Sequence, residues 1–297
     1  MAFAEDTRIA AVVVTYNRPV ELRKVILALK KQSRSLDQII VLDNACEVPA
    51  AATLSNVEKI EVIRSSVNSG GAGGFALGLE AALRHSPDWI WLMDDDAVPR
   101  NDALAELLNA IPKVPGRAGA LCSSVYEDGE LALVHRRSYS PVLVHEVSVA
   151  RSYYEQNLTE IDTGSFVGFM VRSVAVRQIG VPEKDFFLAY DDTEYSLRLI
   201  RNGWRNWLVP ASGIDHLRTR QSRLRTSSFG SKHYYNIRNR IVVALRYGRW
   251  PLLAGSVATL VGTGLWLACG GYKGEGSQLF ARAVRDGWTG VLGPLSG

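Results

Sequence analysis

Cysteine, histidine and methionine are scarce in this chain of 297 residues, which contains three, five and three of them. The cysteines, at 46, 122 and 269, lie far apart and form no CxxC pair. This excludes a structural zinc site and argues against a disulfide framework, so a reduced, cytosolic environment is expected. The first ten residues, MAFAEDTRIA, also lack the basic start and apolar stretch of a secretion signal.

Acidic residues are absent from 217–249, a stretch with nine lysines and arginines that we call the basic segment. Residues 1–215 carry 22 basic and 28 acidic side chains, a net charge of −6. Nucleic-acid-binding proteins are usually basic across their working face, so this distribution argues against a nucleic-acid partner. A basic segment attached to an acidic body predicts a local anionic partner, such as a membrane surface or a phosphorylated lipid.

Charge of either sign is absent from the next 23 residues, 250–272. A bilayer takes about 20 apolar residues to cross, but glycine, serine and threonine dilute the hydrophobicity of this run. It is compatible with a single span, a helix in the membrane interface, or a buried core or oligomer helix. We expect a peripheral or weak membrane anchor, because basic flanks beside an uncharged run are typical of one.

The first two thirds of the chain alternate apolar, β-branched runs with segments of helical periodicity. Strands are expected at 9–16, 38–42, 59–63, 89–93, 162–171 and 207–210, and helices at 21–31, 70–84 and 103–111. This order predicts an α/β fold with a Rossmann-like, mainly parallel sheet covered by helices. The region 123–160 has little pattern and is expected to be an insertion of loops or short strands. We expect a catalytic domain at 1–217, followed by a basic, helical, membrane-associating region at 218–297.

Polar residues follow four of the expected strands, namely Thr15 with Arg18, Asp43, Asn68 and the aspartate triplet 94–96. In open α/β sheets, ligands bind at the carboxyl ends of the strands. The sequence therefore predicts a binding site along this edge.

The aspartate triplet ends the apolar run WIWLM. Three carboxylates so placed repel one another, and a bound divalent cation would relieve the repulsion. Because alternate residues of an extended chain share a face, Asp94 and Asp96 are expected to point one way and Asp95 the other. Oxygen ligands favour Mg²⁺ or Mn²⁺, and such an ion completes its shell with water and substrate phosphates. Helix capping or simple solvation is the alternative.

Two further features have an ordinary and a functional interpretation. The glycine-rich stretch 67–75, which contains Gly71, is neither a P-loop nor a GxGxxG motif. It is compatible with phosphate binding at a helix start and equally with tight helix-on-strand packing. Asp191 and Asp192 precede an expected helix, where they would serve as helix caps or as a general base. His216 is an ordinary polar residue or a third metal ligand.

Several motifs together resemble the inverting glycosyltransferases of family 2, which have a GT-A fold. The motifs are VVVTYNRP, VLDN, NSGGAGGF, WLMDDDA, YDDTEYSLRLIRNGW and the histidine of GIDH. Within that family the chain is most similar to bacterial galactofuranosyltransferases and rhamnosyltransferases that act on polyprenyl-diphosphate-linked acceptors. The GGAGGF, DDD and YYNIRNR elements and the 24-residue step from Asp192 to His216 favour the galactofuranosyl branch.

The resemblance implies roles for individual residues of this chain. Those implied to contact a nucleotide-sugar donor, here a UDP-sugar, are Thr15, Arg18, Asp43, Asn68, Gly71 and Asp95. Asp94, Asp96 and His216 are implied to bind Mn²⁺ or Mg²⁺. Asp192 is implied to be the catalytic base, with Asp191 beside it as a possible substrate contact.

The implied activity is metal-dependent, inverting transfer of galactofuranose from its UDP donor to a lipid-linked glycan of the cell wall or surface polysaccharide. We expect this at the cytoplasmic face of the bacterial cell membrane, with homo-oligomers possible. Transfer of rhamnose or another hexose, a metal-dependent nucleotidyltransferase and an inactive glycosyltransferase-like scaffold subunit are the alternatives.

Overall fold

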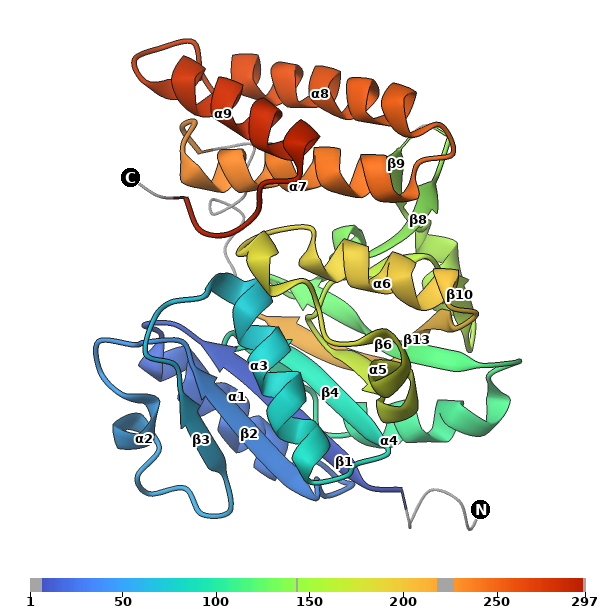
Figure 1. Ribbon diagram of the computed structural model, residues 1–297. Coiled ribbons are helices and arrows are strands. Elements are labelled where there is room, and N and C mark those ends of the chain that lie inside the picture. Colours follow the sequence, from blue (N-terminus) through green and yellow to red (C-terminus); the bar gives the residue numbers. More distant parts are fainter. Residues whose placement is uncertain (1–6, 143, 218–226, 296–297) are drawn as a thin grey trace.

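A strand with seven buried residues, β1 (Ile9–Thr15), lies inside the main sheet of the computed structural model. The structure describes residues 7–142, 144–217 and 227–295. Helices cover both faces of this sheet, and a layer of three further helices stands beyond one end of it (Figure 1).

The elements follow one another as the alternating pattern predicts, with additional short strands in the second half. The strands are β1, β2 (Gln38–Asp43), β3 (Glu61–Arg64), β4 (Trp89–Asp94), β5 (Ala97–Pro99), β6 (Ala118–Glu127), β7 (Glu130–Leu131), β8 (Arg136–Ser140), β9 (His145–Ser148), β10 (Thr159–Ile161), β11 (Thr163–Gly164), β12 (Phe169–Arg172) and β13 (Arg205–His216). The helices are α1 (Pro19–Lys30), α2 (Ala50–Thr53), α3 (Gly70–Arg84), α4 (Ala103–Ala110), α5 (Ser173–Ile179), α6 (Asp191–Arg201), α7 (Ser231–Tyr247), α8 (Pro251–Ala268) and α9 (Gly276–Thr289).

The main sheet has the strand order β10-β13-β6-β12-β4-β1-β2-β3. Strands β3, β2, β1 and β4 are parallel, which brings their carboxyl ends to one edge. Strand β12 is antiparallel to both neighbours, while β13 runs parallel to β6. The expected α/β fold with a mainly parallel sheet is confirmed.

Strand β1 shows why the apolar runs have no alternation of polar and apolar residues. Its residues Ile9, Ala11 and Val13 pack in a core with α1 and α4. The intervening residues belong to a second core with α3, α5 and α6. A strand buried on both faces has no solvent-facing side, so continuous apolar sequence is what the fold requires.

The region 123–160 contains the short strands β7, β8, β9 and β10, as one of the two expectations has it, but its first five residues are not part of an insertion. Residues 118–127 form β6, which lies between β13 and β12 inside the sheet. The strand is hard to recognise because it contains buried serines, and Ser123 Oγ lies 2.7 Å from Ser212 Oγ of β13. The run 162–171 is also two strands, β11 and β12, and 207–210 is part of the longer β13.

Helices α7, α8 and α9 form the C-terminal layer and share a hydrophobic core of their own. In Figure 1 α8 is the outermost helix of this layer. It is the one helix, in the described part of the chain, that is long and apolar enough to cross a membrane by length and composition. Four arginines of the basic segment, at 218, 220, 223 and 225, lie outside the described residues.

The glycine-rich start of α3 packs closely on β1. A Cβ atom on Gly74 would lie 2.5 Å from Val14 Cγ1, and one on Gly78 would lie 2.4 Å from Val12 Cγ1. Gly71 is different, because a Cβ atom there would meet nothing within 4 Å. Helix-on-strand packing therefore accounts for Gly74 and Gly78, and Gly71 is left open toward the edge of the sheet.

Close packing predicts opposite effects of alanine at two of these positions. Gly78→Ala should lower the free energy of unfolding by about 1–3 kcal/mol, because its methyl group overlaps Val12. Gly71→Ala is the matched control and should leave stability unchanged or raise it by up to about 1 kcal/mol through helix propensity. Urea unfolding monitored by circular dichroism measures both. Equal stability of the two variants would contradict this packing.

Candidate metal and nucleotide-sugar site

Three predicted metal ligands meet at one edge of the sheet. Asp94 is the last residue of β4, and the chain turns through Asp96 into β5. Strand β5 pairs antiparallel with the end of β13, which sets His216 opposite Ala97. His216 Nε2 lies 3.2 Å from Asp96 Oδ1. One ligand atom from each of Asp94, Asp96 and His216 lies within 4.8 Å of the other two.

The charges in this cluster interact strongly because Asp96 and His216 are buried and Asp94 is partly buried. Burial and the nearby Asp96 carboxylate raise the pKa of Asp94 to about 7. Burial opposes the charged form of His216, but the carboxylates of Asp96 and Asp94 raise the pKa of its ring above the ordinary value. The Arg18 guanidinium forms an ion pair with Asp96 and lies 3.7 Å from Asp95 Oδ1. Repulsion between the carboxylates is thus only partly offset by protein cations.

Asp95 has contacts of its own, and the alternation expected of an extended chain does not apply to it because Asp95 and Asp96 lie in the turn between β4 and β5. Its carboxylate accepts hydrogen bonds from Thr15 Oγ1 at 2.8 Å and from the Tyr16 backbone N–H at 3.1 Å. Burial nevertheless raises the pKa of Asp95 to about 6. Asp95 and Thr15 therefore join the ends of β4 and β1.

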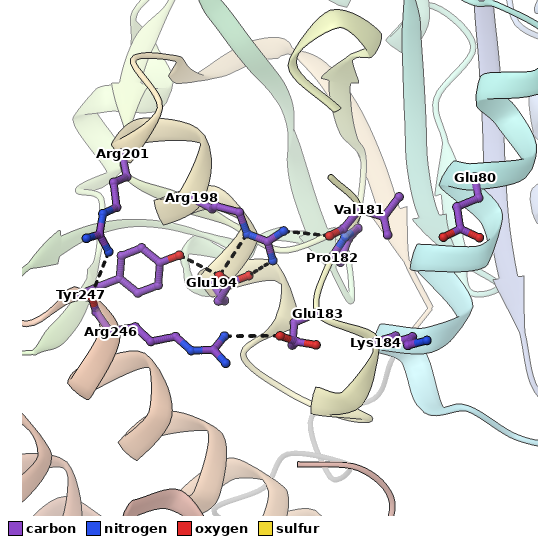
Figure 2. A pocket seen from close by; sticks show the side chains of 10 residues that line it. All are labelled: Glu80, Val181, Pro182, Glu183, Lys184, Glu194, Arg198, Arg201, Arg246 and Tyr247. Carbon is purple, nitrogen blue, oxygen red and sulfur yellow. Dashed lines mark hydrogen bonds and ion pairs between the residues drawn. The ribbon is translucent and has the colours of Figure 1, made fainter. Parts of the chain in front are cut away.

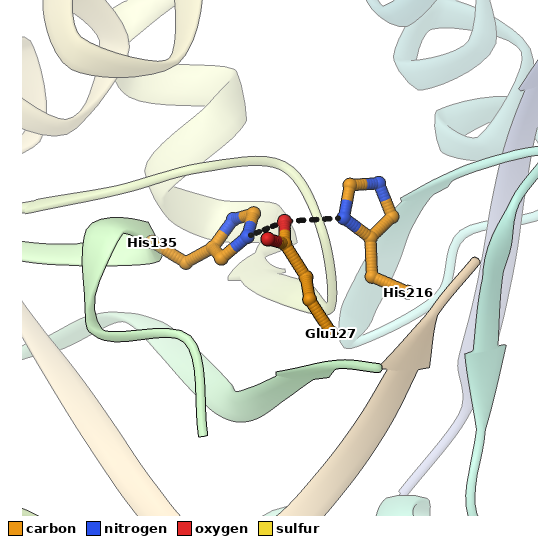
Figure 3. A group of neighbouring side chains, drawn as sticks. All are labelled: Glu127, His135 and His216. Atoms are coloured by element: carbon orange, nitrogen blue, oxygen red, sulfur yellow. Dashed lines mark hydrogen bonds and ion pairs between the residues drawn. The ribbon is translucent and has the colours of Figure 1, made fainter. Parts of the chain in front are cut away.

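Glu127 and His135 belong to this site and were not identified from the sequence. Glu127 Oε1 lies 3.2 Å from Nδ1 of His216 and 3.1 Å from Nε2 of His135 (Figure 3). His135 Nδ1 in turn lies 2.8 Å from Ser165 Oγ. A carboxylate bound to Nδ1 of a histidine orients the ring and directs Nε2 toward a metal. The detectable signal was an acidic residue at the end of β6, in a region where we expected loops or short strands.

The other residues predicted to contact the nucleotide sugar lie around the end of β2 and the beginning of α3. Asp43 accepts hydrogen bonds from the backbone of Cys46 at 2.7 Å and of Ala50 at 2.9 Å. It also accepts one from Arg64 at 3.2 Å. These partners fix the loop after β2 and leave Asp43 fully buried.

Asn68 is held by Asn44, a residue that was not predicted to belong to the site. Asn44 Nδ2 donates to Asn68 Oδ1 at 3.1 Å and to the Gly70 carbonyl at 2.9 Å. The Gly70 N–H donates to Asn68 Oδ1 at 2.8 Å. The end of β2 is thereby tied to the beginning of α3, next to Gly71.

Two pockets differ in whether predicted site residues line them. A pocket of about 190 Å³ opens at the ends of β1 and β2 and is lined by residues that include Thr15, Arg18 and Cys46. A larger one of about 570 Å³ lies between α6 and α7 and contains none of the predicted site residues (Figure 2). The smaller pocket is therefore the one that adjoins the predicted nucleotide contacts.

Asp191 and Asp192 begin α6, as predicted, and lie in low-dielectric surroundings. Burial and the adjacent Asp192 raise the pKa of Asp191 well above its usual value, and Asp94 adds to this shift. Burial also raises the pKa of Asp192, against the opposing charge of Arg137. A carboxylate with a raised pKa is a better proton acceptor at neutral pH than an ordinary one.

The ligand atoms of Asp94, Asp96 and His216 suit a hard divalent cation. Asp94 and Asp96 offer carboxylate oxygens, which suit Mg²⁺ and Mn²⁺, and His216 offers one imidazole nitrogen. The raised pKa of Asp94 is that of a carboxylate lacking a sufficient counter-charge. A 2+ ion at these ligands would supply the missing charge.

Comparison with known proteins adds the family. The family model "Glycosyl transferase family 2" matches residues 10–177, more than half of the chain. The chain belongs to glycosyl transferase family 2. The match includes the aspartate triplet, while Asp191, Asp192 and His216 lie beyond it.

Individual relatives are similar over different lengths. The chain is 35% identical over 198 residues to a galactofuranosyltransferase, GlfT1, of Mycobacterium tuberculosis. That match covers 65% of this chain and 64% of the relative, so it spans less than two thirds of the relative's length. It is also 24% identical to the dTDP-rhamnosyl transferase RfbF of Shigella flexneri, over 97% of this chain and 98% of the relative.

A solved structure has the same type of fold. The crystal structure of GalNAc-T7 with UDP, GalNAc and Mn²⁺ superposes with a TM-score of 0.63 at 13% identity. The superposition covers 80% of this chain and 47% of that one. This likeness is one of fold and supports the expected GT-A architecture.

The titration of the cluster predicts how metal affinity depends on pH. A metal ion must displace protons from Asp94, with its pKa of about 7, and from His216. Mn²⁺ affinity should therefore rise between pH 6 and pH 8 by about tenfold or more. Calorimetric titration with MnCl₂ measures this, and Asp215→Asn at an exposed neighbouring carboxylate is the control. The same affinity at both pH values would contradict the assignment.

The raised pKa of Asp94 also affects the stability of the folded protein. Because Asp94 keeps its proton in the folded state and loses it in the unfolded state, the stability that this side chain contributes to the metal-free protein is lost as pH rises from about 4 to about 7. The raised pKa of His216 acts in the same direction above its ordinary value. Added Mn²⁺ should restore stability more strongly at pH 8 than at pH 6.

Proposed function

We propose that the protein is a metal-dependent, inverting glycosyltransferase that moves galactofuranose from UDP-galactofuranose to a glycan on a polyprenyl diphosphate. The observation that carries the proposal is that Asp94, Asp96 and His216 meet at the strand ends. The charge of Asp94 also helps to raise the pKa of Asp191, so the acidic pair of α6 faces the same site. Family membership supports the reaction class, and similarity to the mycobacterial galactofuranosyltransferase supports the sugar.

Asp192 is the proposed base. It takes the proton from an acceptor hydroxyl, whose oxygen bonds to the anomeric carbon while the bond from that carbon to the nucleoside diphosphate breaks. One displacement inverts the anomeric centre and needs no covalent intermediate. Asp94, Asp96 and His216 would hold a divalent cation, which would supply positive charge to offset that of the departing diphosphate. Thr15, Arg18, Asp43, Asn68, Gly71 and Asp95 are proposed to form or support the donor site.

Donor screening with a synthetic polyprenyl-diphosphate glycan tests this proposal. The wild type with Mn²⁺ should consume UDP-galactofuranose in preference to other nucleotide sugars and release UDP, as read by product mass and linkage. Asp192→Asn should bind donor with unchanged affinity but lose turnover by about 10²-fold or more, because the base no longer accepts a proton. Normal turnover by this variant would reject the base.

A rhamnosyltransferase is the second candidate, favoured by the similarity to RfbF along nearly the whole chain. The same screen separates the two, because dTDP-rhamnose would then be the preferred donor. Release of pyrophosphate in place of a nucleoside diphosphate would instead indicate a nucleotidyltransferase. No turnover with any donor, together with retained metal binding, would favour an inactive scaffold subunit.

Helix α8 supports a membrane surface as the place of the reaction. Its small residues Ala254, Ala258 and Gly262 are buried against the neighbouring helices. Its other side is apolar and exposed, with Leu252 at 74% and Leu260 at 71%. Because one side of α8 packs on protein and the other faces outward, this geometry suits a helix lying in the membrane interface.

The ends of α8 fit the same placement. Eighteen residues of helix extend about 27 Å, slightly less than the roughly 30 Å hydrocarbon core of a bilayer. Trp250 and Tyr272 stand exposed at the two ends, next to Arg249 and Lys273. Aromatic and basic residues in these positions are typical of membrane interfaces. We propose peripheral attachment to the cytoplasmic face of the cell membrane, where the lipid-linked acceptor is found.

Charge placed on this apolar side should prevent attachment. The double variant Leu252→Glu, Leu260→Glu should reduce co-sedimentation with anionic phospholipid vesicles by about tenfold or more, since each buried leucine contributes roughly 1.5–3 kcal/mol. Val174→Glu, at an exposed apolar residue of α5, is the matched control. Unchanged vesicle binding would reject the surface. A change only in oligomeric state, measured by light scattering, would identify it as a contact between copies.

A further inference from the structure

The loop 185–190 delivers Asp191 and Asp192 to the site and has an unusual backbone. Phe187, Ala189 and Tyr190 have φ angles of 63°, 66° and 66°. Side-chain-bearing residues rarely adopt this left-handed conformation, and a segment with three of them persists only when surrounding groups hold it. The position of Asp192 therefore depends on whatever holds this loop.

The groups that hold the loop come from α7, in the C-terminal layer. Asn239 Nδ2 lies 3.0, 2.9 and 2.8 Å from the carbonyl oxygens of Phe186, Leu188 and Ala189. One side-chain amide thus donates its hydrogens among three carbonyls of the loop. Asn239 is completely buried, so water is kept from replacing these contacts.

Arg238 completes this clamp. Its Nη2 donates to the carbonyl oxygens of Asp185 at 3.2 Å and Phe186 at 2.9 Å. Its Nε donates to Asn239 Oδ1 at 2.8 Å, which orients that amide with its nitrogen toward the loop. Arg238 is only 1% exposed. The two adjacent side chains therefore act as one unit, which we call the α7 clamp.

The same loop also contacts the start of α3 on the nucleotide side. The Ala72 N–H donates to the Phe187 carbonyl at 3.2 Å. Gly70 approaches so closely that a Cβ atom there would lie 1.9 Å from that carbonyl oxygen. The backbone between the α7 clamp and the glycine-rich helix start has little freedom to move.

The chain end and the far end of α7 add further contacts. Arg238 Nη1 donates to the Gly293 carbonyl at 2.7 Å, and the Gly293 N–H donates to the Asp185 carbonyl at 2.7 Å. Figure 2 shows the side chain of Tyr247, the last residue of α7, beside Glu194 of α6, and Tyr247 Oη donates to Glu194 Oε1 at 2.7 Å. Helix α7 is thus fixed both to the loop and to the helix that carries Asp192.

We infer that Arg238 and Asn239 are positioning residues that hold the loop 185–190 and thereby place Asp192 for proton removal. This rests on the proposed function in one respect, that Asp192 is the base. The C-terminal layer is then part of the catalytic unit as well as the proposed membrane attachment. On this inference, residues of the expected membrane-associating region at 218–297 position a residue of the expected catalytic domain at 1–217.

Asn239→Asp tests the inference with almost no change of shape, because an oxygen that repels the three carbonyls replaces the donor nitrogen. Turnover should fall by about 100-fold, the effect of a displacement of about 1 Å at a reacting group. The affinity for UDP with Mn²⁺, measured by calorimetry, should change little. Amide hydrogen exchange in 185–192 should become faster.

Tyr234→Phe is the matched control on the same helix. It removes a buried hydrogen bond, 2.7 Å long, from Tyr234 to Asp286 of α9 and leaves the loop contacts in place. Its melting temperature should fall, but the turnover of the folded enzyme should remain near that of the wild type. If Tyr234→Phe and Asn239→Asp lost turnover equally, the loss would be caused by lower stability of the helical layer and not by misplacement of Asp192. That result would overturn the inference.

A milder variant keeps the test decisive if Asn239→Asp does not fold. Asn239→Ser retains one hydrogen-bond donor and should lose about tenfold in turnover at unchanged UDP affinity. Wild-type turnover by a folded Asn239 variant overturns the positioning role, whatever Asp192 does. Normal turnover by Asp192→Asn would instead reject the base assignment, so the two failures are distinguishable.

Discussion

Repulsion between Asp94 and Asp96 at the end of β4 is the constraint around which the site is built. The protein offsets it with Arg18 from the β1–α1 connection and with His216 from the end of β13. Asp95 is held by Thr15. The offset is incomplete, since Asp94 retains a pKa of about 7. A site with this residual need for positive charge suits a divalent cation.

The second constraint is the backbone of the loop before α6. Left-handed residues store strain, and the hydrogen bonds of Asn239 and Arg238 are the compensation. The layer of α7, α8 and α9 therefore has two sides with different tasks. Its inner side holds the loop that carries the acidic pair of α6, and its outer side exposes leucines of α8. The proposed attachment and the proposed positioning would both depend on one small helical core.

Several parts of this arrangement were predictable because local sequence determines them. Apolar β-branched runs identified β1, β2 and β4, and the aspartate triplet follows the last of these runs at the edge of the sheet. Resemblance to a known family suggested His216 as their partner. Gly74 and Gly78 were ambiguous, and only the distances to Val14 and Val12 assign them to packing.

Other parts were not predictable. Strand β6 has buried serines paired across the sheet, so its sequence lacks the apolar signal of a central strand and concealed Glu127. Arg238 and Asn239 look like polar residues on an ordinary helix, because nothing in their own segment reveals the carbonyls of 185–190.

The sequence by itself determined the α/β class, the strand ends with their carboxylates and the uncharged run before the C-terminus, because periodicity and composition are properties of neighbouring residues. The tertiary structure alone decided that β5 pairs with β13 to bring His216 to Asp96, that Glu127 orients this histidine, and that α7 holds the loop of Asp192. Each of these contacts joins residues that are tens of positions or more apart, and the free energy that selects such pairs comes from packing the whole sheet and its helices.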